Sequence, residues 1–401
     1  MQRFGSALAF GLGFTVWFAS NAGASVLVVD PSGAGGAFMS LQAALDAAAP
    51  NDVIHVKGGT YVEITIAKPV TIVGDPMPTI RTPLPHEYTG STLTCPPAIT
   101  LAGPGTGTVT LVDVKAAGFA DASFFAAFDA MLAGGGFTSL RIVGGSVTGP
   151  DAIFSTGVGP GAAAIKTSIP LIHLASTTIV GGENTTDVPC ALMPPFGPLG
   201  IDAPNSTIVV LDSVVRGGRG SDTVSCFGGI CGDGSPPPCP CAYKGGYGGD
   251  GIRAQRVYVS NSLVTGGPGM LLVSDCAGGV PWGQQPDGAP YAPGVAVVAL
   301  NNDLTSSPPL KLGGSTTLQW NAGVGQLLVL STQTGVPLDL AQGRFFLEPT
   351  APMLIAPIAS GVATATLHVP SSPVWIGVPL VAQVFDATNG LTRPVIDMVR
   401  P

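Results

Sequence analysis

Residues 208–217, IVVLDSVVRG, contain the pattern that decides the fold, and five other stretches repeat it. We call its last residue, Gly217, the anchor. Apolar residues stand nine, seven and two positions before the anchor, here Ile208, Val210 and Val215. Five positions before the anchor stands Asp, Asn, Gly or Ser, the residue types that tolerate tight turns and left-handed backbone. The other five stretches are 109–118 (VTLVDVKAAG), 140–149 (LRIVGGSVTG), 172–181 (IHLASTTIVG), 257–266 (VYVSNSLVTG) and 297–306 (VVALNNDLTS).

This pattern predicts a strand, a sharp bend and a second short strand. Apolar residues two apart, such as Ile208 and Val210, share one face of a strand. Val215 follows after an odd step of five, so the chain must turn at Asp212 if all three side chains point into one core. Repeats of variable length with a fixed motif are typical of solenoids. We therefore expect an all-β fold, a right-handed parallel β-helix (a single-stranded solenoid) over residues 25–310.

The first 24 residues have the features of a secretory signal peptide. Arg3 precedes a mostly apolar stretch at 8–18, which ends before the small residues Ala22, Gly23 and Ala24. We expect cleavage after Ala24 and a protein that is extracellular or held in the cell envelope, in the periplasm or on the outer surface. No later stretch is apolar over the roughly 18 residues that a membrane-spanning helix needs, so we expect no membrane span in the mature chain.

A short helix should precede the repeats. Ser40 can cap a helix that begins at Leu41, and Pro50 ends the run of helix-forming residues. Its expected role is to cover the first coil, because a solenoid needs its ends protected. Two early strands are predicted at Ile54–Val56 and Val70–Ile72.

Residues 27–75, LVVDPSGAGGAFMSLQAALDAAAPNDVIHVKGGTYVEITIAKPVTIVGD, resemble the opening coils of the pectin-lyase-like superfamily of right-handed parallel β-helices. That superfamily contains pectate lyases, pectin methylesterases, polygalacturonases and noncatalytic surface proteins. The resemblance implies the fold and does not choose a function, because one fold hosts many different sites.

Residues 311–401 show a different pattern of strands separated by Gly, Pro and Asn-Gly turns, which predicts a small antiparallel β-sandwich.

Charged residues make up only 10% of the chain, and its net charge is −8 without any cluster of Lys or Arg. Nucleic acid needs a basic footprint, so it is not an expected partner. We expect a monomer whose partner is a polysaccharide or a cell-surface component.

Four long insertions follow the same corner of successive coils, at 119–137, 183–203, 219–250 and 268–294. Insertions that share a corner project from one side of a solenoid. All seven Cys lie beyond the signal peptide, and an oxidising compartment makes disulfides the expected state. The pairing stays open, no metal site is expected, and the six Cys inside the insertions are Cys190, Cys226, Cys231, Cys239, Cys241 and Cys276.

Aromatic residues in or beside these insertions are candidates for stacking on sugar rings, although packing of the loops against the solenoid is the favoured explanation for them. They are Phe196, Tyr243, Tyr247, Trp282 and Tyr291.

Charged residues near the fourth and fifth repeats are candidates for catalysis, because lyases of the resembled superfamily use carboxylate-bound calcium and an Arg or Lys base. These are Arg216, Arg219, Asp222, Asp250 and Arg253.

Two functions stay open. One is binding of polysaccharide or another surface molecule through loops on one face, without cofactor. The other is a carbohydrate-active enzyme, a polysaccharide lyase or an esterase, with a divergent site, and calcium is expected only in that case. The sequence contains no Asp-Asp pair of the kind expected for a polygalacturonase.

Overall fold

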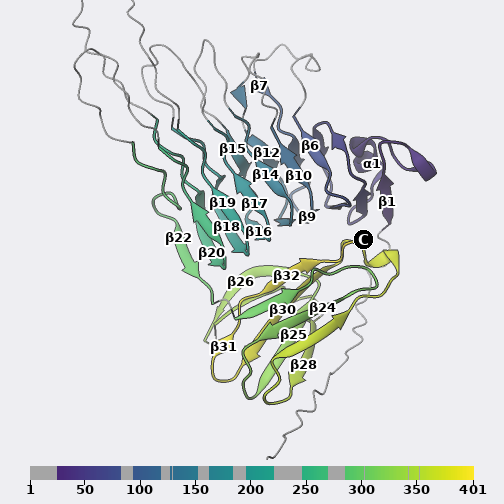
Figure 1. Cartoon of the computed structure of the whole chain (residues 1–401), viewed down its shortest axis with the longest axis vertical. Helices are drawn as coiled ribbons and strands as arrows, with labels where there is room; N and C mark the ends of the chain where they lie inside the picture. Colours follow the sequence, from purple (N-terminus) through teal and green to yellow (C-terminus); the bar gives the residue numbers. More distant parts are fainter. Residues whose placement is uncertain are drawn as a thin grey trace, which may run out of the picture. The chain divides into compact units, whose positions relative to one another are not determined.

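The computed structural model describes residues 25–82, 94–118, 127–128, 130–151, 162–183, 196–220, 246–269, 285–301, 303–341, 343–351 and 353–401. Within them the chain consists mostly of β-strands, mostly in parallel sheets, with few helical residues (Figure 1). Its contacts divide it into two compact units at the boundary between Ala299 and Leu300, and each is described by itself. The predicted signal peptide at 1–24 lies outside the described residues.

Residues 27–299 form three ladders of parallel strands, here called A, B and C. Ladder A contains β4 (Ile64–Ile66), β8 (Ile99–Ala102), β12 (Ala130–Gly135), β15 (Ala163–Thr167) and the first parts of β18 (Ile201–Leu211) and β20 (Ile252–Ser260). Ladder B contains β1 (Val26–Val29), β2 (Val53–Val56), β5 (Thr71–Gly74), β9 (Thr108–Val112), β13 (Ser139–Val143), β16 (Leu171–Ala175), the later parts of β18 and β20, and β22 (Ala296–Ala299). Ladder C contains β3 (Thr60–Tyr61), β6 (Thr79–Arg81), β10 (Lys115–Ala117), β14 (Ser146–Thr148), β17 (Thr178–Val180), β19 (Val214–Arg216) and β21 (Leu263–Thr265).

The strand register confirms the predicted columns of the first five repeats. Ile208 is the partner of Ile172 on one side and of Val257 on the other, as its place in the motif requires. In ladder C, Val215 is likewise paired with Ile179 and Val264. The predicted bend is also present: the turn residues have left-handed backbone, with φ of 50° at Asp113, 68° at Gly144, 53° at Ser176, 49° at Asp212 and 46° at Asn261.

The sixth repeat was predicted wrongly in its second half. Val297 continues ladder B as expected, opposite Val257. Leu304, however, lies in β23 (Leu304–Ser307), which pairs antiparallel with Trp320 of the following strand. Its side chain belongs to the apolar core of residues 300–401, so the parallel ladders end before the predicted boundary at 310.

Ladder A is the element that the sequence motif missed. Parts of the predicted insertions at 119–137, 183–203 and 219–250 or their flanks are strands with a core-facing column of their own. The aligned residues are Ile64, Ile99, Leu132, Ile165, Ile201 and Ile252, and all are buried in the same core as the columns of ladders B and C. Each complete repeat therefore has three strand segments.

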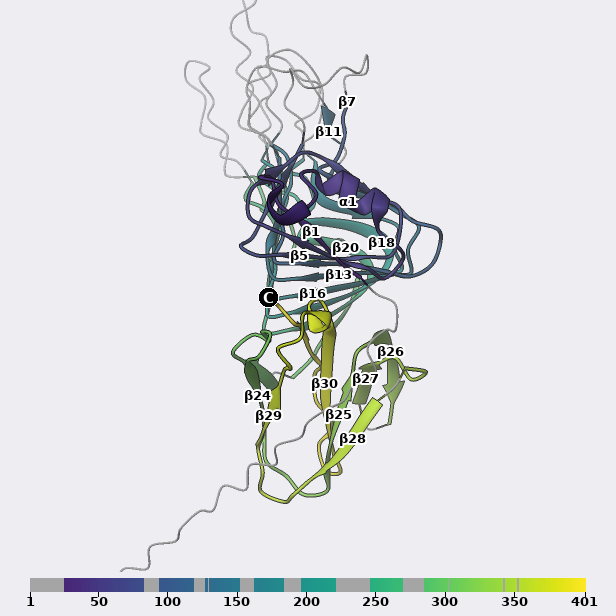
Figure 2. The ribbon, with the colours of Figure 1, turned by 90° about the vertical axis from the view of Figure 1, so that its right-hand side faces the viewer.

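The predicted capping helix is confirmed as α1 (Leu41–Ala47), whose N-cap Ser40 accepts a hydrogen bond from the Ala43 amide. Leu41, Ala44 and Leu45 on one face of α1 are buried in the core of the ladders. The helix lies beside β1 at the N-terminal end of the ladders, as both views show (Figures 1 and 2). It thereby covers apolar side chains that no preceding repeat could cover.

Residues 300–401 contain only antiparallel pairings among their named strands. One sheet contains β23, β24 (Ser315–Trp320) and β29 (Thr364–His368); a second contains β28 (Met353–Ile358), β25 (Gln326–Ser331), β30 (Pro379–Asp386), β31 (Gly390–Leu391) and β32 (Val395–Met398). The pair β26 (Thr334–Leu340) and β27 (Gly343–Leu347) completes the unit. Side chains from both larger sheets, among them Leu318, Leu330 and Val384, share one apolar core.

The turn column gives a first prediction. Replacing Asp212 by Val should lower the free energy of unfolding by about 2 kcal/mol, because a β-branched residue is strained at positive φ and the bond from Asn261 Nδ2 to Asp212 Oδ1 (2.6 Å) is lost. Replacing Asp212 by Gly loses the bond without the strain, so its effect should stay under about 1 kcal/mol. Urea denaturation followed by circular dichroism measures both, and equal losses would contradict the assignment of this column to strained turns.

Candidate functional site

Five segments, four of them rich in glycine, lie next to the ladders at the corner from which the insertions leave. They are 196–200, 217–220, 246–251, 266–269 and 285–290, and we call them the glycine bundle. The segment 246–251 is central, because it bonds to all four others: its Gly249 amide donates to the Gly218 carbonyl (2.9 Å), and its Gly249 carbonyl accepts from the Gly267 amide (2.7 Å). On its other sides the Tyr247 carbonyl accepts from Gly197 (2.7 Å), and the Gly251 amide donates to Ala289 (2.8 Å).

A strand in a flat sheet has two neighbouring strands. Segment 246–251 has four neighbouring segments, so it is not a strand of such a sheet. This region was predicted to be part of the insertion at 219–250, and residues 246–251 are held there by backbone hydrogen bonds on several sides. Glycine is required here for close approach and not for an unusual φ. A Cβ on Gly218 would lie 1.9 Å from the Gly182 carbonyl oxygen, one on Gly267 would lie 1.9 Å from the Gly218 oxygen, and neither residue has positive φ.

The glycine bundle also brings two aromatic rings together. Phe196 and Tyr247 stack with ring centroids 5.4 Å apart and an interplanar angle of 23°. The hydrogen bond from the Gly197 amide to the Tyr247 carbonyl ties their backbones directly beside the rings. Phe196 keeps 62% of its surface exposed, while Tyr247 is half-buried. The pair therefore presents a flat apolar surface on a fixed backbone.

Two of the catalytic candidates make structural contacts. Arg253 donates from Nε and from a terminal nitrogen to the two carboxylate oxygens of Asp202, at 2.7 and 2.6 Å, and this partner keeps the pKa of Arg253 above its usual value. The two residues are register partners in ladder A, so the pair links adjacent repeats. Asp250 accepts a hydrogen bond from the Ala289 amide at 2.8 Å and so helps to hold segment 285–290 in the bundle.

Two of the remaining charged candidates lie within the described residues, on different elements. Arg216 lies exposed at the end of β19 in ladder C. Arg219 lies in the glycine bundle, between Gly218 and Gly220. Asp222 lies outside the described residues. No group of three or more His, Cys, Asp or Glu among the described residues could hold a metal ion.

The other aromatic candidates are distributed differently. Tyr291 packs half-buried against the core of the ladders next to Ile252, and this burial raises the pKa of its hydroxyl. Tyr243 and Trp282 lie outside the described residues, as do the six cysteines of the insertions. In the part of the face that can be described, the aromatic surface is thus the pair Phe196 and Tyr247.

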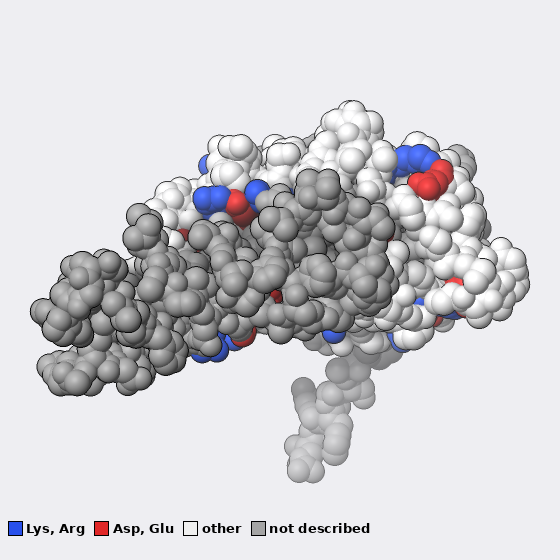
Figure 3. All heavy atoms as spheres, turned by 90° about the horizontal axis from the view of Figure 1, so that it is seen from above, with Lys and Arg blue, Asp and Glu red and all other residues white. Residues whose placement is uncertain are grey.

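Charge is sparse on this protein. Figure 3 shows Lys and Arg side chains in small separate groups, several of them beside Asp or Glu, among mostly uncharged atoms. None of the helices in the described residues is long and apolar enough to cross a membrane.

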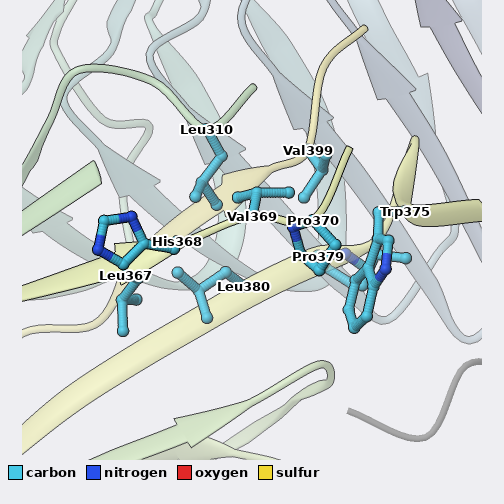
Figure 4. A pocket seen from close by; sticks show the side chains of 10 residues that line it. Leu310, Leu367, His368, Val369, Pro370, Trp375, Pro379, Leu380 and Val399 are labelled. Atoms are coloured by element: carbon cyan, nitrogen blue, oxygen red, sulfur yellow. The ribbon is translucent and has the colours of Figure 1, made fainter. Parts of the chain in front are cut away.

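A small apolar cavity lies within residues 300–401, where Trp375, Pro370 and Pro379 approach the core residues Leu380 and Val399 (Figure 4). Its volume is about 40 Å³. Pockets that bind small molecules usually have volumes of about 300–1,000 Å³, so we interpret this space as an imperfection in core packing.

No family model, no curated protein and no solved structure matches this chain.

Part of the candidate face could have been found from the sequence: paired glycines begin at the anchors of three successive repeats, at Gly181-Gly182, Gly217-Gly218 and Gly266-Gly267. The contact of Phe196 with Tyr247 left no such signal, because 51 residues separate them and neither occupies a position of the repeat.

The close approach of the bundle backbones can be tested at Gly267. Replacement by Ala should cost roughly 1–3 kcal/mol of unfolding free energy, because the added methyl group overlaps the Gly218 carbonyl oxygen. The exchange of the Gly267 and Gly249 amides with deuterium should accelerate at the same time. Gly314→Ala is the control: Gly314 also lacks positive φ, and its Cβ would meet no atom closer than 3.2 Å. Similar exchange rates in wild type and Gly267→Ala would contradict the bundle.

Proposed function

We propose that this protein is a secreted or envelope-located, right-handed parallel β-helix related to the pectin-lyase-like superfamily, and that it binds polysaccharide or a similar surface molecule through the face that carries its insertions. The fold proposal is supported by three parallel ladders with one strand segment in each ladder per repeat. It is also supported by the turn column with positive φ at five consecutive repeats.

The binding proposal rests mainly on the pair Phe196 and Tyr247. Sugar rings present flat C–H faces, which pack on aromatic rings and exclude water from both surfaces. Two stacked rings held by backbone hydrogen bonds lose little conformational freedom on binding, so more of the contact energy is retained. The position of the pair beside the stems of the insertions agrees with the general use of loops on a rigid scaffold for recognition.

An enzymatic role has less support. A lyase of the kind considered requires several carboxylates and a base within reach of one substrate. Asp202 and Arg253 neutralise each other, and Asp250 accepts a backbone amide. Two of the charged candidates, Arg253 and Asp250, thus serve contacts between repeats, and we propose binding without turnover as the main function.

The direct test is incubation of the purified protein with neutral and acidic polysaccharides, with and without calcium, followed by pull-down and by ultraviolet absorbance of unsaturated products. Phe196→Ala and Tyr247→Ala should each weaken retention by about three- to tenfold, because each removes one stacked ring. Tyr247→Phe should keep wild-type retention, since it preserves the ring.

Val336→Ala is the matched control, because Val336 is an exposed apolar residue (60%) outside the face and should not affect retention. Retention that is unchanged in both ring variants would refute the proposed site. New absorbance that disappears with a chelator would establish the enzyme instead.

A further inference from the structure

A polar hollow of about 350 Å³ lies within residues 300–401. Its volume falls in the range of about 300–1,000 Å³ that is usual for small-molecule sites, unlike the apolar gap of Figure 4. Every lining side chain is polar and none is cationic; the lining consists of Asn301, Asp303, Asn321, Gln326, Asp386, Asn389, Gly390 and Thr392.

The floor of the hollow is a fixed network of hydrogen bonds. Trp320 Nε1 donates to Gln326 Oε1 (3.0 Å), and Gln326 Nε2 donates to Asp386 Oδ2 (2.7 Å). Asp386 Oδ1 accepts from the amides of Thr388 and Asn389, both at 2.8 Å. Hydrogen bonds from Asn389 first, and then from Gln326 and Thr388, lower the pKa of Asp386, so the network keeps a negative charge.

The rim of the hollow has unused hydrogen-bonding capacity. The exposed Asn321 amide makes no side-chain hydrogen bond within the described residues. Asp303 accepts the Arg393 amide with Oδ1 at 2.9 Å, and its Oδ2 has no partner in the described structure. Asn389 donates weakly to Asp386 Oδ1 (3.3 Å) through Nδ2, which leaves its side-chain oxygen available. The rim thus offers donors and acceptors side by side.

These features favour a polyhydroxylated ligand over a metal ion. Both oxygens of Asp386 are already occupied by N–H donors, and a Ca²⁺ ion would need oxygen ligands at about 2.3–2.6 Å around a space far smaller than 350 Å³. Amide and carboxylate groups together match hydroxyl groups, each of which donates and accepts. An anionic ligand is disfavoured because the lining contains two carboxylates and no cation.

We propose that the hollow lined by Asn321, Asp303 and Asn389 is a second binding site, which takes a neutral sugar or a comparable polyol. This site is independent of the aromatic pair Phe196 and Tyr247, and the proposal does not rest on the function proposed for that pair. It assigns a ligand-binding role to the C-terminal unit.

The test is isothermal titration of the full chain with a panel of neutral mono- and disaccharides and inositol. We expect saturable binding of at least one member. Asn321→Ala should weaken it by about three- to tenfold, the usual effect of losing one hydrogen bond. Asp303→Asn should weaken it to a similar degree, because the amide replaces the Oδ2 acceptor by a donor. Thermal unfolding of the Asn321→Ala variant should match wild type, since the described contact of Asn321 uses its backbone carbonyl, which accepts from Gln326 Nε2 at 2.9 Å and is kept in alanine.

Gln319→Ala is the control, because Gln319 is an exposed amide on β24 of the same unit that does not line the hollow. Phe196→Ala should likewise leave binding of the small sugars unchanged. Absence of saturable binding across the panel would overturn the proposal. Calcium binding in the same titration that is abolished by Asp303→Asn would also overturn it, because the hollow would then be a cation site.

Discussion

Each repeat in residues 27–299 must satisfy its backbone hydrogen bonds with the next repeat, because parallel strands have no partners within their own repeat. This requirement extends through the corners between strands. The Ser176 amide donates to the Leu211 carbonyl at 3.0 Å, and the Asp212 amide donates to Ser260 at 3.1 Å, so even the turn residues are paired between repeats. A turn that differed in length or in backbone conformation would break this pairing for every strand after it.

Hydroxyl groups complete the pairing at the residue after three of the five turns. Thr177, Ser213 and Ser262 occupy this position in consecutive repeats, and Ser213 Oγ accepts the Thr177 amide at 3.1 Å while Ser262 Oγ accepts the Ser213 amide at 3.1 Å. Each hydroxyl also donates to a carbonyl, as Ser213 does to Leu211 at 2.7 Å. Small polar residues at this corner are thus a consequence of the same requirement, since a buried amide without a partner costs about 1–3 kcal/mol.

The same requirement explains which parts of the fold the sequence revealed. The strand, turn and strand of ladders B and C have constant length, so the columns of Ile208, Val210 and Val215 could be read directly and their register was correct. Ladder A follows insertions of variable length: its core residues lie 14 positions after the anchor Gly118 and 35 positions after the anchor Gly217. Counting from the anchors could not find it, although the column of Ile and Leu residues is as regular in space as the other two.

The candidate sites were harder to predict because they depend on pairs that no repeat specifies. Arg253 and Asp250 are suitable residue types for catalysis in isolation, and only their contacts with Asp202 and the Ala289 amide show that they hold repeats together. Asp386 stands in β30, within the region 311–401 for which strands were predicted, but its network with Gln326 joins residues 60 positions apart. Only folding brings such polar groups together. The composition therefore shows which polar side chains the protein has, and the pairing of the backbone determines which of them lie close together. Charged residues make up only 10% of this chain, and among the described ones Arg253, Asp250 and Asp386 are engaged between repeats or within a network, which makes exposed rings and amides the better candidates for contact with a ligand.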